Sequence, residues 1–382
     1  MADKMFSAEH EEMRLVLRKF IEKELAPHAD EWEAAEGFPS EVFRRMGELG
    51  FLGLWYPEEY GGSGGDYLYS VVLAEEMSRS RCGGLGMGLA VHTDMVLPTI
   101  LKFGTEEQKQ KYLVPGLKGE KIACLGITEP NTGSDVQAIR TVARRDGNDW
   151  VINGSKLYIT NGVRSDFILL VSKTETTQRG ANAVTLFLVD KTTPGFTVSR
   201  KLKKLGMHAS DTAELSFQDV RVPNSAILGE EGKGFYHIMW ELQVERLFAA
   251  VGAVAAAQRA FDLAYDYAKE RVSFGQPISQ FQVIKHKFAD MATQIEAGRQ
   301  LTYSAVEKYM AGGYPVKEIT MAKLFTAQMS NRVADEALQI HGGSGYMDEY
   351  EISRIWRDLR LNRVGAGTDE IMKEVICKTL GL

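Results

Sequence analysis

The sequence is poor in cysteine, and its three cysteines follow no pattern. Cys82, Cys124 and Cys377 are far apart in a chain of 382 residues, with no Cys-x-x-Cys pair and no metal-ligand spacing near them. An odd number of scattered cysteines argues against a disulfide framework and against a zinc site. We therefore expect reduced thiols in a reducing compartment, and no bound metal.

Signature motifs of other enzyme classes are also missing. No Gly-x-Gly-x-x-Gly follows a strand pattern, which argues against a nicotinamide-binding Rossmann site, and no His-Glu-x-x-His is present to bind a catalytic metal. The glycine-rich run from Pro57 to Gly65 lacks the Gly-Lys-Ser/Thr of a P-loop, so we predict a connector there.

The chain has no excess of basic residues and, from its apolar runs, no segment expected to span a membrane. A formal net charge of −6 at pH 7 and a pI near 5.8 argue against nucleic acid as the main partner. The first residues lack a hydrophobic secretory core and the Arg- and Ser-rich character of a transit peptide. These features predict a cytoplasmic protein with no membrane span.

Hydrophobic periodicity changes twice along the chain. Residues 7 to 120 repeat apolar side chains at helical spacing, with Ser7 and Ser40 as predicted N-caps. From residue 121 the pattern alternates, and Asn153-Gly154 predicts a tight turn between two strands that end at Ile152 and begin at Lys156. From Gly229 onward long apolar helical patterns return.

These changes predict an α+β fold of several domains. We expect an N-terminal helical domain (residues 1–120), a middle β domain (121–228) and a C-terminal four-helix bundle (229–382) with antiparallel neighbours.

One stretch at the start of the alternating region has a composition suited to a ligand. The residues from Leu125 to Asp135 pass from apolar side chains to Thr, Pro, Gly and a Ser-Asp pair, which exposes backbone N–H groups and hydroxyls in one loop. On composition alone, an ordinary strand-to-loop transition is equally consistent with this stretch.

The same stretch resembles the flavin signature of the acyl-CoA dehydrogenase family. Further segments that resemble the family follow in its order and spacing: Tyr158–Gly162, Arg271–Gln282, Gln339–Gly345 and Gly367-Thr368. The resemblance spans nearly the whole chain. It implies that the protein binds FAD, acts on an acyl-CoA and forms a homotetramer, or at least a dimer.

The resemblance implies a set of flavin contacts. Thr128 is expected to hydrogen-bond the ring, Tyr158 to pack on it where many relatives have Trp, and Arg271, Phe274 and Gln282 to reach the cofactor of a neighbouring subunit. The full set implied is Leu125, Ile127, Thr128, Gly133, Ser134, Tyr158, Thr160, Arg271, Phe274, Gln282, Gln339, Gly342, Gly343, Thr368 and Glu370.

The expected catalytic base is displaced from its commonest position in that family. Many members carry a Glu in a late Tyr-Glu-Gly-Thr motif, and here Ala366 stands at that place. Isovaleryl-CoA and long-chain acyl-CoA dehydrogenases instead place the base in a Glu-Arg-Leu motif, which matches Glu245-Arg246-Leu247. The resemblance implies Glu245 as base, the backbone N–H of Ala366 as a donor to the thioester carbonyl, and substrate contacts from Ser134, Gln243, Arg246 and Gly365.

The implied reaction is flavin-dependent α,β-dehydrogenation of an acyl-CoA to a trans-2-enoyl-CoA, with an electron-transfer flavoprotein as acceptor. Burying a carboxylate beside an apolar chain raises its pKa and strengthens it as a base. Around Gln339 to Lys373 the match is nearest to the long-chain type.

Alternatives remain at this stage. Asp94 lies either at a surface helix end, the interpretation that its polar neighbours favour, or in the acyl pocket, where it would act as an additional or replacement base on a branched or alicyclic carboxyl-CoA. An oxidase of the same fold and a non-catalytic acyl-CoA binder are two further hypotheses.

Overall fold

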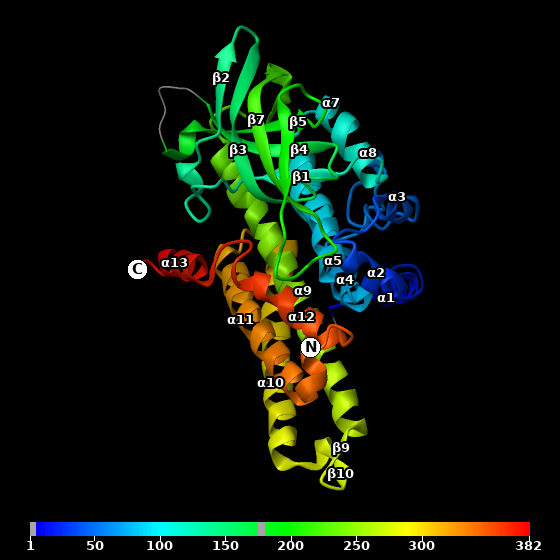
Figure 1. Cartoon of the computed structure of the whole chain (residues 1–382). Coiled ribbons are helices and arrows are strands. Elements are labelled where there is room, and N and C mark those ends of the chain that lie inside the picture. Colours follow the sequence, from blue (N-terminus) through cyan, green and yellow to red (C-terminus); the bar gives the residue numbers. More distant parts are fainter. Residues whose placement is uncertain (1–4, 175–179) are drawn as a thin grey trace.

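The computed structural model describes residues 5–174 and 180–382. In Figure 1 a β-sheet lies at one end, N-terminal helices lie along one side, and three long helices extend away from the sheet to a far tip. The arrangement confirms the predicted fold class, with helical, β and helical parts in chain order.

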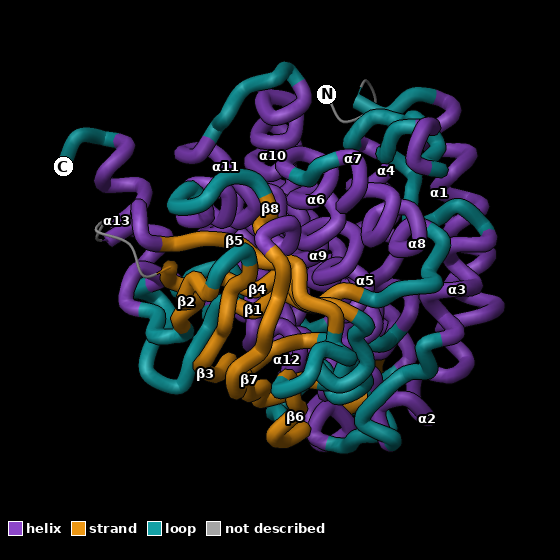
Figure 2. Tube along the Cα trace, turned by 90° about the horizontal axis from the view of Figure 1, so that it is seen from above, coloured by secondary structure: helices purple, strands orange, loops and turns teal. Residues whose placement is uncertain are grey.

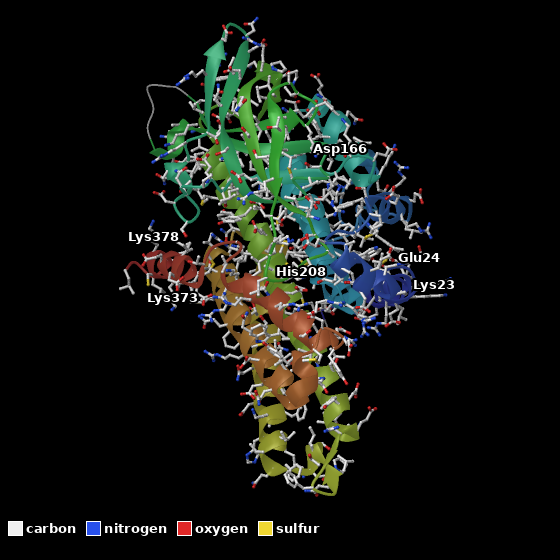
Figure 3. All side chains as sticks on the ribbon, in the orientation of Figure 1. Lys23, Glu24, Asp166, His208, Lys373 and Lys378 are labelled. Atoms are coloured by element: carbon white, nitrogen blue, oxygen red, sulfur yellow. The ribbon has the colours of Figure 1, made fainter. Side chains whose placement is uncertain are left out.

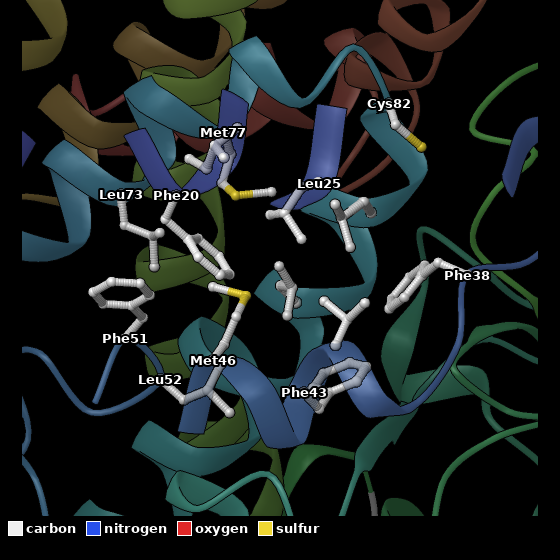
Figure 4. Packing of buried hydrophobic residues seen from close by; sticks show 14 of the residues in the cluster. Phe20, Leu25, Phe38, Phe43, Met46, Phe51, Leu52, Leu73, Met77 and Cys82 are labelled. Carbon is white, nitrogen blue, oxygen red and sulfur yellow. The ribbon is translucent and has the colours of Figure 1, made fainter. Parts of the chain in front are cut away.

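The N-terminal part consists of short helical segments around one apolar core. Ser7 caps the first helix as predicted, because its hydroxyl accepts a hydrogen bond from the His10 N–H, whereas Ser40 precedes a helix without making a capping bond. Figure 4 shows the packing of Phe20, Phe43 and Met46 in the core of this part. The segments are α1 (Ala8–Phe20), η2 (Ile21–Leu25), η3 (Ala26–His28), α2 (Ala29–Ala34), α3 (Glu41–Glu48), η4 (Glu58–Tyr60), α4 (Leu68–Met77), η5 (Ser78–Ser80), α5 (Gly83–Ala90), η6 (Val91–Val96), α6 (Leu97–Phe103), α7 (Glu106–Gln108), η7 (Lys109–Leu113) and α8 (Val114–Leu117).

The middle part is an eight-stranded sheet with the order β6-β7-β3-β2-β4-β5-β8, in which β1 pairs in parallel with β4. Figure 2 shows these strands gathered together, and β5 packs against α9 while β1 packs against η6. The elements are β1 (Ala123–Gly126), η8 (Val136–Ala138), β2 (Val142–Asp146), β3 (Asp149–Thr160), β4 (Phe167–Thr174), η9 (Gly180–Ala183), β5 (Val184–Asp190), β6 (Phe196–Lys201), β7 (Thr212–Pro223), η10 (Asn224–Ala226) and β8 (Ile227–Leu228).

The predicted turn at Asn153-Gly154 is wrong. Strand β3 runs unbroken through these residues, and Gly154 lies at a β-bulge against β7 instead. The hairpin turn that precedes β3 lies at Gly147 and Asn148, between the paired residues Asp146 and Asp149. A glycine after Asn signals a turn only where the ladder ends, and here the neighbouring strand continues the pairing.

The C-terminal part is a helical bundle. Helix α9 leads from the sheet to the tip, α10 returns, α11 descends again and the shorter α12 packs against α9 and α11 (Figure 1). The elements are α9 (Gly234–Glu270), β9 (Val272–Ser273), β10 (Gln276–Pro277), η11 (Ile278–Gln280), α10 (Gln282–Met310), α11 (Val316–His341), η12 (Gly342–Tyr346), α12 (Glu351–Leu359), η13 (Arg360–Arg363) and α13 (Asp369–Thr379).

The expectation that no apolar run is long enough to span a membrane needs a correction. Two helical runs, Gly83–Phe103 and Gly234–Glu270, are long and apolar enough to cross a membrane, each with a mean hydropathy of 1.3. Their apolar windows are 83% and 50% buried inside the protein, which is typical of core helices. Length and composition alone therefore do not assign them to a membrane.

A buried ion pair ties the end of β1 to β3. The ammonium of Lys156 is fully buried and donates to the carbonyl of Ile127 at 3.0 Å and to the carboxylate of Glu129 at 2.8 Å. Glu129 also accepts from the backbone N–H groups of Arg140 and Thr141. Burial lowers the pKa of Lys156 to about 8, an effect that Glu129 opposes. The pair fixes the loop that follows Gly126.

We expect Lys156→Met to destabilise the protein by about 3–5 kcal/mol, because it leaves the Glu129 carboxylate buried without its cation. The double variant Lys156→Met/Glu129→Gln is expected to recover a large part of the loss. Urea unfolding of both variants measures the effect. A double variant as unstable as the single one would contradict this assignment.

Candidate active site

A cavity runs along α9, between that helix, α5 and α12. It holds about 1090 Å³ of empty space, its open mouth included. On α9 the lining runs from Glu245 to Arg259, a distance of about 21 Å at the rise of an α-helix. Most of the lining is apolar, and the two lining cations Arg81 and Arg259 lie together, because both bind the carboxylate of Glu351. Such a shape suits a long apolar group whose reactive end lies at Glu245.

Glu245 is the ionisable group at one end of the apolar lining. It lies in the interior of α9, where Leu247 and Val244 anchor the neighbouring faces in the core. Burial raises the pKa of Glu245, while the nearby cations Arg246 and Lys323 act in the opposite direction. The side chain keeps partial exposure because it faces the cavity. A carboxylate poorly solvated in this way is a stronger base than one in water.

The loop Gly365–Thr368 faces Glu245 across the cavity, with Gly365 and Ala366 in its lining. Its backbone is unusual, because Ala366 has a φ of 55° and Gly367 a φ of 104°. Two buried cations hold it: Nε of Arg246 donates to the Ala366 carbonyl at 3.0 Å, and Nζ of Lys323 donates to the Gly367 carbonyl. The backbone N–H of Ala366 thus belongs to a fixed loop that lines the same cavity as Glu245.

Of the four residues predicted to contact the substrate, one lines the cavity and three lie outside its lining. Gly365 lines the cavity, whereas Arg246 is buried behind it and binds the loop, and Gln243 is buried against the carbonyl of Met239. Ser134 lies exposed in the loop after β1. A contact of Arg246, Gln243 or Ser134 with CoA remains a prediction.

Glu241 lies one turn before Glu245 and is fully buried. Neither of its carboxylate oxygens has a hydrogen-bond partner among the described residues. Burial and the neighbouring Glu245 raise its pKa well above the ordinary value, with Arg246 acting in the opposite direction. Two carboxyls one turn apart in an apolar interior do not ionise together readily, so Glu241, the more deeply buried of the two, favours its protonated form.

Asp94 is buried, with 1% of its surface exposed, so the interpretation as a surface helix end is wrong. It lies in η6, where the hydroxyls of Ser70 and Thr93 donate to its two oxygens at 2.6 and 2.7 Å. Burial raises its pKa to about 6. Its neighbour Met95 lines the cavity, whereas Asp94 is not among the lining residues. Glu245, and not Asp94, therefore lines this cavity.

One group of the predicted flavin residues lies on the sheet, close to the end of α9 that carries Glu245. Leu125, Ile127 and Thr128 follow from β1, and the carbonyl of Thr128 accepts from the N–H of Leu157, next to Tyr158. Tyr158 is 66% exposed and has a φ of 63°. An aromatic face left open by a constrained backbone fits a flat ring that packs on it. Gly133, Ser134 and Thr160 belong to the same region.

A second group lies at the opposite tip. Arg271, Phe274 and Gln282 follow the end of α9, which at 37 residues is about 55 Å long, and Phe274 is 95% exposed. Gln339, Gly342 and Gly343 come near the same tip, since His341 stacks on Tyr267. Thr368 and Glu370 form a third group, where Thr368 caps α13. One chain does not bring the first two groups together, as Figure 1 shows.

Several residues of the site were not predicted from the sequence. Lys323 and Glu241 were missed because a lone Lys or Glu in a helical pattern is usually solvated. Gly86 and Gly252 line the cavity, and a Cβ added at either would meet no atom within 4 Å. A helical glycine that opens onto empty space was the available signal for a cavity wall.

Family models match almost the whole chain. "Acyl-CoA dehydrogenase, N-terminal domain" matches residues 7–120, "Acyl-CoA dehydrogenase, middle domain" residues 124–220, and "Acyl-CoA dehydrogenase, C-terminal domain" residues 232–381.

Individual proteins match over a similar length. The mitochondrial long-chain specific acyl-CoA dehydrogenase of Mus musculus is 42% identical over 378 residues, 99% of this chain and 87% of the relative. The crystal structure of an acyl-CoA dehydrogenase from Geobacillus kaustophilus has a TM-score of 0.97 at 45% identity, covering 99% of this chain and 100% of that one. A structure described as an electron transferring flavoprotein of Acidaminococcus fermentans has a TM-score of 0.94 at 37% identity, covering 98% of each chain.

We expect Glu241→Leu to stabilise the protein by about 1 kcal/mol or more at pH 7, because it removes a buried carboxyl without a partner. The raised pKa of Glu241 means that its contribution to stability is lost as pH rises above the ordinary value of 4.5, so the gain is expected to be smaller at pH 4. Urea unfolding at both pH values measures this. Glu241→Gln, which keeps a buried polar group, is the control, and a loss of stability in Glu241→Leu would contradict the assignment.

Proposed function

This chain belongs to the acyl-CoA dehydrogenase family, and we propose that it dehydrogenates long-chain acyl-CoA thioesters with Glu245 as the base. Enzymes of this family carry out flavin-dependent dehydrogenation of acyl-CoA and use FAD. The observation that carries the finer proposal is one cavity with Glu245 and Ala366 at one end and a long apolar wall beyond them.

The residues of this chain fit FAD as the cofactor. The backbone of Ile127 and Thr128 and the open face of Tyr158 would hold the ring, in a region fixed by Lys156 and Glu129. When bound, FAD supplies the acceptor for the β-hydrogen of the substrate, which leaves as hydride.

The protein residues handle the proton and the developing charge. With the thioester at the mouth of the apolar wall, the Glu245 carboxylate removes the α-proton and becomes neutral. The electron pair of the broken α-C–H bond forms the new double bond, giving a trans-2-enoyl-CoA. The Ala366 N–H donates to the thioester carbonyl while that oxygen carries partial negative charge. The apolar lining keeps water from the base, which preserves its basicity.

Small side chains on α9 and α5 support a long acyl chain as the substrate. Gly252, Ala253 and Ala256 on α9 and Gly86 on α5 leave the cavity open beyond Glu245. Four methionines, Met77, Met87, Met95 and Met207, contribute to the lining, and their flexible side chains adapt to a chain of variable shape. The relative from Mus musculus carries the name of a long-chain specific enzyme, which agrees with this choice.

The structure gives less support to Asp94 as the base, to a non-catalytic acyl-CoA binder and to an oxidase. Both oxygens of Asp94 are engaged by hydroxyls outside the cavity wall, so no geometric observation favours it as a base. An ionisable Glu245 in the cavity wall supports catalysis over passive acyl-CoA binding. Rapid oxygen consumption on turnover would be the sign of an oxidase.

We also propose a homotetramer, or at least a dimer, and an electron-transfer flavoprotein as acceptor. Two of the expected FAD-binding groups lie at opposite ends of α9, so a second copy is needed to complete one cofactor site.

Helix α13 projects from the body, with Lys373 and Lys378 pointing outward (Figure 3). The structural likeness to the Acidaminococcus protein supports the proposed acceptor.

We expect anaerobic addition of a long-chain acyl-CoA to bleach the flavin absorbance of the purified protein, and Glu245→Gln to slow bleaching by at least about 100-fold. Because Glu245 acts when ionised and its pKa is raised, the rate is expected to fall on acidification, at a pH above the ordinary Glu value of 4.5. Stopped-flow absorbance over a pH series measures both effects. Unchanged bleaching in Glu245→Gln would assign the base elsewhere, and Asp94→Asn tests the next candidate.

We expect Gly252→Leu and Gly86→Leu to shorten the cavity without harming the chemistry. Each methylene excluded costs about 0.8 kcal/mol, so excluding two lowers kcat/KM for a long-chain substrate about tenfold or more. A four-carbon acyl-CoA serves as the control within each variant and should react as in the wild type. Equal losses for both chain lengths would argue against this cavity as the acyl site.

A further inference from the structure

We propose that Lys323, a buried lysine of α11, is a positioning residue that aims the Ala366 N–H at the substrate carbonyl. The inference rests on the proposed function, because it assigns a role within the same reaction. Lys323 is 1% exposed, and Nζ donates a hydrogen bond to the carbonyl of Gly367. Gly367 directly follows Ala366, whose N–H the mechanism requires.

Lys323 acts together with a second cation from another helix. Arg246 of α9 donates from Nε to the Ala366 carbonyl at 3.0 Å, while Lys323 of α11 binds the next carbonyl along the chain. Two successive peptide groups are thus each held by a buried cation. Hydrogen bonds from charged donors are about twice as strong as neutral ones, so this arrangement fixes the orientation of both peptides.

The loop needs such anchors because its backbone is strained. Ala366 adopts a φ of 55°, a left-handed conformation that is unfavourable for a residue with a Cβ, and Gly367 follows at 104°. The Ala366 N–H belongs to the peptide before the two anchored ones and is joined to them through the positive φ of Ala366. Without an anchor on the Gly367 carbonyl, the backbone after Ala366 can relax this φ toward an unstrained value, which would turn the Ala366 N–H away from the cavity wall.

The charges around Lys323 fit a positioning role. Burial lowers its pKa to about 8, with Asp369 and Glu245 favouring the charged form and Arg246 opposing it. Asp369 is itself held by Arg363 at 2.7 Å and by Gln328 at 3.1 Å. Removal of Lys323 therefore disturbs the loop and also removes one cation near Glu245, so the experiment must separate these effects.

A series of three variants at residue 323 separates position from charge. Lys323→Met removes donor and charge, Lys323→Gln keeps a neutral donor, and Lys323→Arg keeps both. Lys317→Met, at an exposed lysine of the same helix, is the matched control. We expect Lys323→Met to lower kcat with a long-chain acyl-CoA about 100-fold, the usual effect of losing one oxyanion donor, with KM within about threefold. Lys323→Arg should recover most of the rate and Lys323→Gln part of it.

A substrate analogue isolates the proton-transfer step. A 3-thiaacyl-CoA has an acidic α-proton but carries no hydrogen at its third position, so it forms the enolate without losing hydride. The flavin absorbance change on deprotonation of the analogue reports its apparent affinity. We expect Lys323→Met to weaken this affinity about 100-fold, in proportion to the loss of kcat. Binding of the enoyl-CoA product should stay within about threefold, because its acyl part carries no enolate charge.

The outcomes distinguish the proposals. Unchanged kcat and unchanged analogue deprotonation in Lys323→Met would overturn the positioning role of Lys323. The proposed function would still stand in that case, provided that the wild-type protein dehydrogenates the acyl-CoA. A shift of the pH profile to higher pH with equal losses in Lys323→Met and Lys323→Gln would assign Lys323 to charge tuning of Glu245 and overturn positioning. If Lys323→Met fails to fold, kcat is compared between Lys323→Gln and Lys323→Arg. A kcat near the wild-type value in Lys323→Arg and an intermediate kcat in Lys323→Gln support positioning, and wild-type kcat in both variants overturns it.

Discussion

The free energy of keeping a carboxylate in an apolar cavity is the constraint on which the rest of this structure depends. Glu245 gains basicity because its charge is poorly solvated, and the same burial makes that charge costly. Arg246 and Lys323 offset part of the cost without neutralising the base through a direct hydrogen bond. The buried cations on α9 and α11 lie where they lower the cost of this charge, whereas Glu241 on α9 is a second buried carboxyl that competes with it for ionisation.

The two halves of the chemistry come from different parts of the chain. The proposed base belongs to α9, while the proposed carbonyl donor belongs to a loop more than one hundred residues later, where the side chain of Ala366 has no part in the proposed mechanism. Here the carboxylate stands on α9 and not in the loop Gly365–Thr368, so only the backbone of this loop takes part in the proposed reaction. Its conformation then depends on the cations that hold its carbonyl oxygens, which explains why Arg246 is found behind the cavity and not in it.

Periodicity predicted the order of helical and β parts because α9, α10 and α11 are long and the β3 and β4 patterns are strong. It failed at Asn153-Gly154, where pairing with β7 overrides a local turn signal. The resemblance to a family predicted roles for Glu245 and Ala366, and both residues line the cavity, while their roles stay predictions. Burial of Asp94 and the role of Lys323 were not predictable, because both depend on contacts between segments far apart in the sequence, such as Ser70 with Asp94 and Lys323 with Gly367.

The glycine- and alanine-lined groove of α9 has a thermodynamic consequence. Where a globular core would carry large side chains, this helix carries Gly252, Ala253 and Ala256, which leaves a cavity beside it. In the proposed complex the acyl chain fills this cavity, and each methylene it buries adds about 0.8 kcal/mol to the stability of the complex. The ligand is then a removable part of the hydrophobic core, and the folding stability of the saturated protein should rise with the number of carbons it holds.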